Sequence, residues 1–243
     1  MTKKGISSNP TLILHIGYRI LKILKEKNGA LIMENEILKK VYTIGYSGFT
    51  SLDDFIATLK HFRVNVVIDV RSHPYSLHYE NYDKDNLERA LNNAGIFYRN
   101  YAREFGARQD NPNYYTNGIL DFNKFTSSSQ FAEGVAKIDK TVSAGYVPVL
   151  MCAEKEPTMC HRAIMISKKL ADELWTIEVE HILPNGKIKT RRDIEKELLD
   201  IYFPDRDQYT FFFDDERDEQ QLIEEAYKKQ NLKIGFHKET INK

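Results

Sequence analysis

The chain has 243 residues, of which 42% are hydrophobic and 29% charged, and its 35 lysines and arginines balance 35 aspartates and glutamates. This composition is typical of a globular protein and argues against a wholly basic nucleic-acid binder, although a local basic patch stays open. Two cysteines exclude a disulfide scaffold, and no apolar run approaches the roughly 18 residues of a membrane span. The N-terminal apolar run is interrupted before any cleavage signal, so we expect a cytoplasmic protein without a membrane segment.

The first forty residues predict a helix. Asn9 and Pro10 are typical of a helix start, and isoleucines follow at helical spacing to about residue 28. We expect this helix to dock on the rest of the chain. A second possibility is that translation can start at Met33, in which case the first 32 residues would be loosely attached. The sequence thus predicts an N-terminal helical extension over 1–40, an α/β core over 41–183 and a C-terminal extension over 184–243 that packs on the core.

From residue 41 onward, strand and helix patterns alternate. We expect strands at 41–46, 64–70, 96–98, 146–151 and 175–182, and helices that start at Thr50 or Ser51 and cover 85–94, 122–144, 158–174 and 191–202. Such alternation predicts an α/β fold with a mostly parallel sheet and helices on both faces. Residues 100–121 show no periodicity and read as a long loop, which is more often functional or mobile than idle.

The C-terminal extension contains an aromatic run, Tyr209 to Phe213, followed by an acidic cluster and a helix pattern through Leu222, Ile223 and Tyr227. An exposed patch of this kind would favour aggregation, so we expect the run to pack on the core or on a partner.

Polar residues follow several predicted strands. Ligands collect at the carboxyl ends of parallel strands, so side chains that follow different strands should converge there. These candidate residues are Gly45, Tyr46, Ser47, Asp69, Arg71, Cys152 and Glu154.

Both cysteines flank one short acidic loop. If Thr158 is a helix N-cap, Cys160 and His161 lie in the first helical turn, where backbone N–H groups favour an anion or a thiolate. We expect Cys152 to be a nucleophile or redox thiol, Glu154 or His161 its acid/base partner, and Arg71 and Arg162 a clamp for an anion. Each cysteine fits equally well as a small core residue.

Familiar motifs fit poorly. An arginine six residues after Cys152 would indicate a tyrosine-phosphatase loop, but Thr158 stands there. The C-x7-C spacing with adjacent Cys160 and His161 matches no common structural zinc pattern, so we assign no metal and leave the cofactor open. Walker, G-x-G-x-x-G and G-x-S-x-G motifs do not occur.

Four successive segments resemble the motifs of domain-of-unknown-function family 488 over about residues 41–181. They are residues 42–47, residues 67–74, Gly95 to Tyr98 with Glu104 to Gly106, and Leu150 to Glu154 with Cys160 to Arg162. The family often has histidine where this chain has Tyr46, and a second glycine where it has Ala107. The resemblance implies an α/β fold with the motif residues gathered in one place and leaves the reaction open.

Residues 68–71 also look like the corresponding strand of rhodanese-type sulfurtransferases, with Cys152 in the place of the catalytic cysteine. The acidic loop around Glu154 and Glu156 departs from the positive environment that a persulfide needs.

The main hypothesis is therefore a pocket that acts on a small anionic or nucleotide-like ligand. Rhodanese-like sulfur transfer is one alternative. Another is a non-catalytic nucleic-acid-binding module that uses Arg71, Arg103 and Arg108, and a third is a structural role in a partner complex or homo-oligomer.

Overall fold

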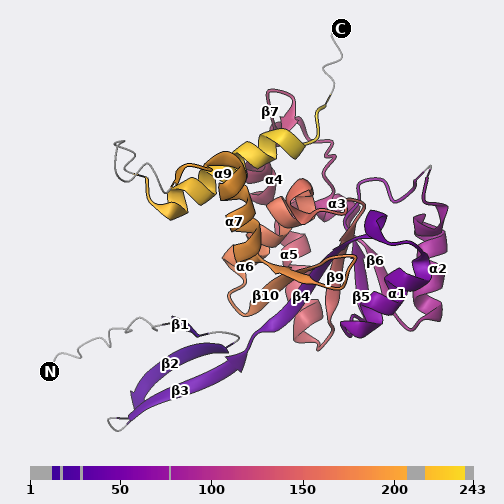
Figure 1. The fold of residues 1–243 in the computed structure, drawn as a ribbon. Helices are drawn as coiled ribbons and strands as arrows, with labels where there is room; N and C mark the ends of the chain where they lie inside the picture. The colour runs from indigo at the N-terminus through magenta and orange to yellow at the C-terminus, as the bar shows by residue number, and fades with distance from the viewer. Residues whose placement is uncertain (1–12, 17–18, 28–29, 77, 207–216, 239–243) are drawn as a thin grey trace, which may run out of the picture.

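The computed structural model describes residues 13–16, 19–27, 30–76, 78–206 and 217–238. At its centre lies a six-stranded sheet in the order β11-β10-β4-β9-β5-β6, in which only β11 runs antiparallel to its neighbour (Figure 1). The α/β class with a mostly parallel sheet is therefore confirmed. The strands are β4 (Lys39–Gly45), β5 (Val66–Asp69), β6 (Phe97–Asn100), β9 (Pro148–Cys152), β10 (Ile177–Ile182) and β11 (Ile188–Thr190).

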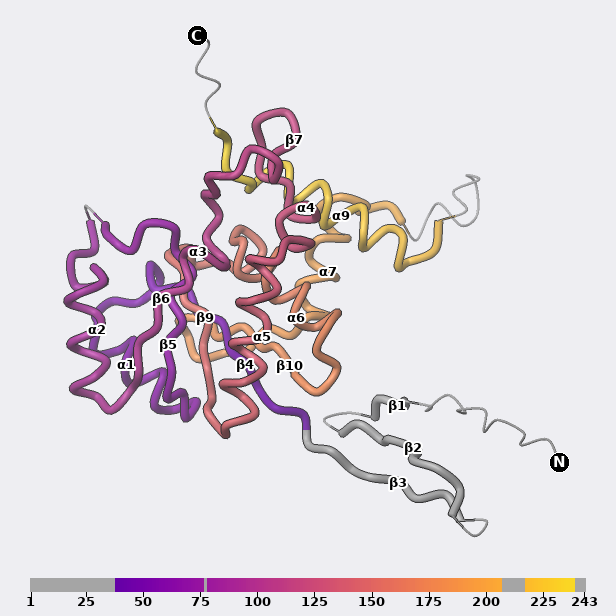
Figure 2. Tube along the Cα trace, turned by 180° about the vertical axis from the view of Figure 1, so that it is seen from behind, coloured from indigo at the N-terminus to yellow at the C-terminus, as the bar shows by residue number. Residues whose placement is uncertain are grey.

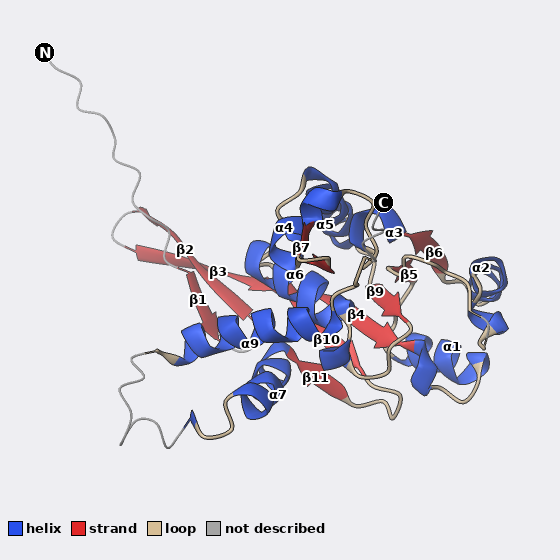
Figure 3. Ribbon diagram, turned by 90° about the horizontal axis from the view of Figure 1, so that it is seen from above, coloured by secondary structure: helices blue, strands red, loops and turns tan. Residues whose placement is uncertain are grey.

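Helices cover both faces of this sheet, as Figure 3 shows from above. One face carries α1 (Leu52–His61), which starts at the Ser51 N-cap, and α2 (Lys84–Asn93). Among the described residues, the opposite face carries α3 (Ala102–Phe105), α4 (Phe122–Thr126), α5 (Ser129–Ser143), α6 (Lys168–Glu173), α7 (Arg191–Tyr202) and α9 (Glu219–Ile234) (Figure 2). We refer to these as the α1 face and the α5 face.

Strand β9 organises the core because it lies in the middle of the sheet and all five of its residues are buried. Successive side chains of a strand point to opposite faces. Leu150 and Cys152 accordingly pack in the apolar cluster of the α5 face, whereas Val149 and Met151 pack in that of the α1 face. The same alternation decides on which face each polar residue at the end of a strand must lie.

The expected N-terminal helix is wrong. The described residues form a three-stranded antiparallel sheet of β1 (Ile13–Ile16), β2 (Arg19–Lys27) and β3 (Ala30–Ile37), whose register pairs Lys27 with Ala30. The dipeptide Asn28-Gly29 fits a helix end, but it is also the pair that favours a two-residue hairpin loop. Isoleucines at helical spacing did not outweigh that hairpin signal, because branched side chains also favour strands.

The expected helix over 158–174 is also partly wrong. A single 3₁₀ turn, Pro157–Met159, precedes an extended Cys160, and the helix begins at His161. Its first part, Arg162–Ser167, is a π-helix, which then continues as α6. Thr158 is therefore not the N-cap of this helix, and Cys160 lies just before it rather than in its first turn.

Other boundaries differ by shorter distances. The helix expected over 122–144 is divided at Ser127 and Ser128 into α4 and α5, because Ser128 caps a new helix. The stretch expected as a loop over 100–121 contains α3, a 3₁₀ turn and the small hairpin of β7 (Tyr115–Thr116) and β8 (Ile119–Leu120). After the turn at 184–186, β11 extends the sheet, an element that the sequence pattern did not predict.

The C-terminal region packs on the α5 face. Residues of α7 and α9, among them Ile194, Leu198, Ile223 and Tyr227, belong to the same buried cluster as Leu150. The aromatic run from Tyr209 to Phe213 lies outside the described residues. Among the helices of the described part of the chain, none is both long and apolar enough to cross a membrane.

Candidate active site

The two cysteines meet at the carboxyl end of β9. Cys152 is the last residue of the strand, and the loop that follows it turns back through a 3₁₀ turn, so that Cys160 returns to the same place. Both side chains are buried and both thiols are free. Their packing with Ile164 and Leu150 places them on the α5 face of the sheet.

His161 joins the two sulfurs. Its Nδ1 lies 3.9 Å from the Sγ of Cys152 and 3.8 Å from the Sγ of Cys160, and its Nε2 lies 3.2 Å from the backbone oxygen of Val70. A carbonyl oxygen only accepts hydrogen bonds, so Nε2 carries the ring proton and donates it to Val70. The lone pair of Nδ1 in the neutral ring therefore faces both sulfurs. We call Cys152, Cys160 and His161 the thiol cluster.

The thiol cluster also has the donor atoms of a metal site. The two Sγ atoms and one nitrogen of His161 all lie within 4.8 Å of one another. Two ligands on a tetrahedral zinc ion would have sulfur and nitrogen about 3.6 Å apart, close to the observed separations. Structural zinc sites use four ligands, and the described residues bring three together here.

Arg162 places a positive charge beside this cluster. Its side chain is fully buried, and it donates from Nη1 to the backbone oxygen of Glu154 at 2.5 Å and from Nη2 to that of Lys155 at 3.2 Å. Its Nε has no hydrogen-bond partner among the described residues, and no carboxylate of the described chain lies within ion-pair distance. A buried cation is costly without a compensating anion.

The end of β4 fits tightly under the same loop. A Cβ added to Gly45 would lie 1.8 Å from the backbone oxygen of Glu154 and 3.1 Å from Nη2 of Arg162. The backbone N–H of Ser47 donates to the oxygen of Ala153 at 3.0 Å. Gly45 and Ser47 thus hold the loop that positions Arg162, and their observed contribution is made by the backbone.

The two thiols differ in proton affinity. The pKa of Cys152 is raised well above its usual value, first by its hydrogen bond with Cys160 and then by burial. Burial acts in the same direction on Cys160, but the hydrogen bond from Cys152 and the positive charge of Arg162 outweigh it and hold the pKa of Cys160 well below its usual value. Cys160 is therefore the sulfur better suited to carry a negative charge.

Glu154 contributes less than the sequence suggested. Its side chain is exposed, and its carboxylate does not belong to the group of atoms that surrounds the sulfurs. Although Glu154 is exposed as a residue, desolvation of its carboxyl group and the nearby Cys160 raise the pKa of that group. Of the two expected acid/base partners, His161 is the one with a lone pair directed at the thiols.

A second polar cluster lies at the end of β5 and comprises Asp69, Arg71 and Tyr98, which we call the carboxylate cluster. Arg71 donates to Asp69 from Nε at 2.9 Å and from Nη2 at 2.6 Å, and the hydroxyl of Tyr98 donates to Asp69 Oδ2 at 2.7 Å. Asp69 is fully buried and Arg71 nearly so. Burial opposes the charge of Arg71, but its bonds to Asp69 prevail and raise the pKa of the guanidinium.

Aromatic rings surround Arg71. Tyr46 stacks on Tyr82 with ring centres 4.3 Å apart, and the guanidinium of Arg71 lies 5.1 Å from the centre of the Tyr46 ring. Arg71 Nη2 also donates to the backbone oxygen of Tyr82 at 2.8 Å, whereas Nη1 has a longer contact of 3.4 Å with the Tyr46 hydroxyl. These contacts account for most of the donors of Arg71.

The sheet separates the candidate site residues into two groups on its opposite faces. All of the candidate residues follow the carboxyl ends of neighbouring strands, as expected. However, Tyr46, Tyr82 and Tyr98 pack on the α1 face, whereas Cys152 and Cys160 pack on the α5 face. The backbone of Val70 joins the two clusters, because its carbonyl accepts from His161 and it precedes Arg71. A clamp formed by Arg71 and Arg162 together stays a prediction, since each guanidinium has its own partners in a different cluster.

The arginines of the 100–121 stretch also have partners. Arg103 forms ion pairs with Glu104 and Glu133, and the guanidinium of Arg108 lies 4.9 Å from the ring centre of Phe236. These contacts leave fewer arginines available for phosphate groups than the sequence suggested. Nucleic-acid binding stays a prediction.

Three contributors were missed from the sequence. The Val70 carbonyl fixes the His161 ring, Tyr98 binds Asp69, and His181 on β10 bonds through Nδ1 to the hydroxyl of Thr43 at 2.8 Å. Tyr98 and His181 lie at or near the carboxyl ends of expected strands, so the rule that selected Asp69 would have found them. A backbone acceptor such as Val70 leaves no signal in a sequence.

The fold and these contacts define an α/β protein with a buried thiol cluster at the carboxyl edge of a parallel sheet. The family model described as "Domain of unknown function DUF488" matches residues 51–168. The resemblance to this family is thereby confirmed over that stretch, which includes both cysteines, His161 and Arg162. No curated protein and no solved structure matches the chain.

Proposed function

We propose that the protein is a thiol enzyme whose reactive unit is the pair Cys152 and Cys160, with His161 as the group that moves their protons. The position of His161 carries this proposal. Its Nδ1 faces both sulfurs while its Nε2 is anchored on Val70. A base that is held by a third group beside a thiol is the arrangement that activates nucleophilic cysteines.

The charge of Arg162 supports the same proposal. Its guanidinium is buried and bonded only to neutral carbonyl oxygens among the described residues. One thiolate in the thiol cluster would balance this charge, and the lowered pKa of Cys160 supports Cys160 as that sulfur. A thiolate beside a positive charge is the reactive form of cysteine.

A pair of sulfurs suits thiol–disulfide exchange with a small disulfide. The Cys160 thiolate attacks one sulfur of the substrate, whose sulfur–sulfur bond breaks and whose other half leaves as a thiolate that takes up a proton. Cys152 then gives its proton to His161 Nδ1 and attacks Cys160, which releases the second half of the substrate. The protein gains one disulfide and the substrate disulfide is reduced to two thiols, so electrons balance.

The proposal includes binding of an anionic or nucleotide-like substrate. Two donors could serve it, which are Nη1 of Arg71, whose contact with the Tyr46 hydroxyl is long, and Nε of Arg162, which has no hydrogen-bond partner among the described residues. Both side chains otherwise serve Asp69 and the loop carbonyls.

An aromatic disulfide that releases a coloured thiol tests the proposal. The wild-type chain should release two coloured thiols per chain and lose two hydrogens in mass, because Cys152 resolves the first adduct. Cys152→Ser should release one and keep the adduct on Cys160, and His161→Asn should react much more slowly. His78→Asn, an exposed histidine, is the control.

Three results would overturn the proposal of a thiol enzyme. One is an adduct on each cysteine of the wild-type protein without an internal disulfide. Another is reaction only after denaturation, which would make the thiols core residues. The third is a stoichiometric metal, found by elemental analysis of the purified protein and lost in His161→Asn, because it would make the thiol cluster a metal site.

A further inference from the structure

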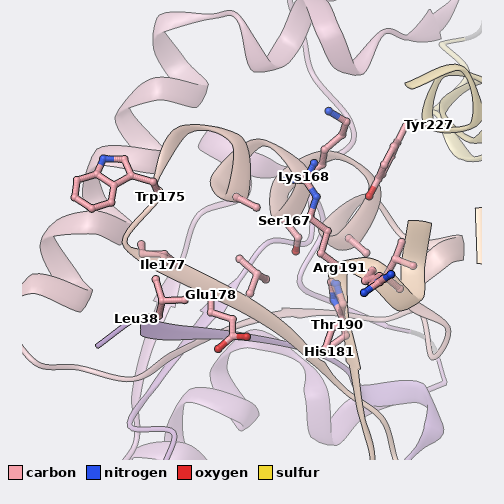
Figure 4. Close-up of a pocket in the computed structure, with 15 residues that line it drawn as sticks. Leu38, Ser167, Lys168, Trp175, Ile177, Glu178, His181, Thr190, Arg191 and Tyr227 are labelled. Atoms are coloured by element: carbon pink, nitrogen blue, oxygen red, sulfur yellow. The ribbon is translucent and has the colours of Figure 1, made fainter. Parts of the chain in front are cut away.

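A cavity of about 330 Å³ lies beside β10, between α6 and the start of α7. Figure 4 shows its lining from inside the protein. Neither cysteine lines it, but Ala163 and Ser167 of the π-helix do. A ligand in this cavity would therefore contact neither thiol, and a proposal for it does not rest on the proposed function.

Polar atoms of two buried residues face this cavity. His181 is 2% exposed and Tyr227 is 6% exposed, and both line it. His181 uses Nδ1 for Thr43, and neither its Nε2 nor the hydroxyl of Tyr227 has a hydrogen-bond partner among the described residues. In Figure 4 the Tyr227 hydroxyl points inward, toward Arg191. Both atoms are therefore available to form a hydrogen bond with a ligand in the cavity.

The start of α7 lies at the same end of the cavity. Thr190 caps this 12-residue helix by accepting from the backbone N–H of Asp193, which leaves the N–H groups of Arg191 and Arg192 free to bind an oxygen. All three of Thr190, Arg191 and Arg192 line the cavity. Free N–H groups at a helix start favour an anion.

Among the described residues, the charges around this end leave one cation without an ion pair. Arg191 pairs with Asp172 and Glu195, and Lys168 pairs with Asp172 and Glu224. Arg192 is exposed and forms no ion pair with a described residue. The carboxylate of Glu178, which also lines the cavity, lies 3.8 Å from Nζ of Lys40, but its buried Oε2 has no hydrogen-bond partner among the described residues. An incoming anion would thus meet Arg192 without displacing an existing pair.

The other end of the cavity has mainly apolar side chains, beside the carboxylate of Glu178 (Figure 4). Leu38, Trp175 and Ile177 lie together there, opposite Arg191 and Tyr227 (Figure 4). Trp175 is the only tryptophan of the chain. The cavity therefore has one end for a negatively charged group and one end for a hydrocarbon or aromatic body.

We propose that this cavity binds a small organic carboxylate with an apolar body. The carboxylate accepts hydrogen bonds at the start of α7 and from Tyr227, and the body packs against Trp175 and Ile177. His181 supplies the remaining polar contact through its Nε2. The size of the cavity limits the ligand to a small molecule.

Fluorescence of Trp175 tests this proposal in the full chain. Phenylacetate should change the emission in a saturable manner, whereas phenylacetamide, which has the same shape without the charge, should bind at least about tenfold more weakly. Tyr227→Phe removes only the unpartnered hydroxyl and should weaken phenylacetate by about tenfold without unfolding the protein. Arg192→Gln should weaken binding and its dependence on salt, whereas Arg89→Gln on α2 should change neither.

Equal binding of phenylacetate and phenylacetamide would overturn the anionic end. Wild-type affinity in both Tyr227→Phe and Arg192→Gln would place the ligand elsewhere. Absence of any saturable response at millimolar phenylacetate in the folded wild-type chain would reject the cavity as a carboxylate site. Alkylation of Cys152 and Cys160, measured on the same samples, reports separately on the thiol cluster.

Discussion

The thiol cluster and the carboxylate cluster lie at the same edge of one sheet, yet they differ in how their charges are balanced. In the carboxylate cluster, Arg71 is bonded to Asp69, and Tyr98 supplies a further donor. Beside the thiol cluster, Arg162 has only carbonyl oxygens among the described residues. A fully compensated ion pair is a structural feature, whereas an uncompensated cation next to thiols favours a reactive thiolate.

The strand geometry explains why two clusters form instead of one pocket. Asp69 and Val70 are adjacent in the chain and therefore point to opposite faces. Asp69 faces Tyr98 on the α1 face, while Val70 packs with Cys152 on the α5 face. Residues that gather at one edge of a sheet can thus serve two separate purposes.

The largest effect should follow from breaking the compensated pair. Asp69→Asn leaves Arg71 buried without its anion, and we expect a loss of about 3–5 kcal/mol in the free energy of unfolding, measured with urea. Asp53→Asn, at an exposed position of α1, is the control. The double variant Asp69→Leu, Arg71→Met should regain part of the loss. A loss below about 1 kcal/mol for Asp69→Asn would contradict a structural role for the pair.

Displacing the loop that holds Arg162 should have the next largest effect. The Cβ of Gly45→Ala would overlap the backbone oxygen of Glu154, so the loop must move. We expect a loss of about 2–3 kcal/mol in urea unfolding together with slower exchange at Cys160. Unchanged stability and unchanged exchange would show that the position of this loop does not matter to the thiols.

The low pKa of His181, on the α5 face, predicts how the free energy of unfolding depends on pH. Burial, then the positive charges of Arg162 and Lys189, lower its pKa to about 3, although Cys160 and Asp193 act in the opposite direction. An unfolded histidine binds a proton below about pH 6.5, whereas folded His181 stays neutral. Its contribution to stability is present above pH 6.5 and is lost as the pH falls toward 3, by about 1.4 kcal/mol per pH unit.

Urea unfolding at several pH values measures this contribution. His181→Asn should flatten the fall in stability between about pH 6 and pH 4, and His78→Asn should not. The same slope in His181→Asn and the wild-type protein would assign the acid sensitivity to other groups.

The smallest effect should come from Tyr98→Phe. It removes one hydrogen bond of 2.7 Å to a charged, buried oxygen of Asp69 and leaves Arg71 in place. We expect a loss of about 1.5 kcal/mol in the free energy of unfolding by urea, against almost none for Tyr146→Phe at an exposed position. A loss as large as that of Asp69→Asn would mean that Tyr98, rather than Arg71, holds the carboxylate.

Much of the core could be predicted because its signals are local. The run from Val64 to Val70 is nearly continuously apolar, which is typical of a strand covered on both faces. Helix α7 has the bounds expected for it, since Thr190 is followed by a regular apolar pattern. The N-terminal strands could not be predicted as readily, because their isoleucines fall at helical spacing and only Asn28-Gly29 favours a hairpin.

The candidate site could be predicted only in part. Strand order brought Cys152, Asp69 and Gly45 to one edge, as the alternation of elements implied. The sequence could not show that Arg162 would bond to its own loop, because a backbone oxygen such as that of Glu154 is contributed by any residue. Nor could it show the extended Cys160, since a π-helical start follows from tertiary packing and has no simple sequence pattern.

The ultraviolet absorbance of thiolate, followed against pH in the folded protein, tests the central claim most directly. If a thiolate balances Arg162, the band should already be present at pH 7, about 1.5 units below the ordinary thiol pKa, and Cys160→Ser should abolish it. A band that develops only near or above about pH 8.5, or one that is unchanged in Cys160→Ser, would contradict the claim.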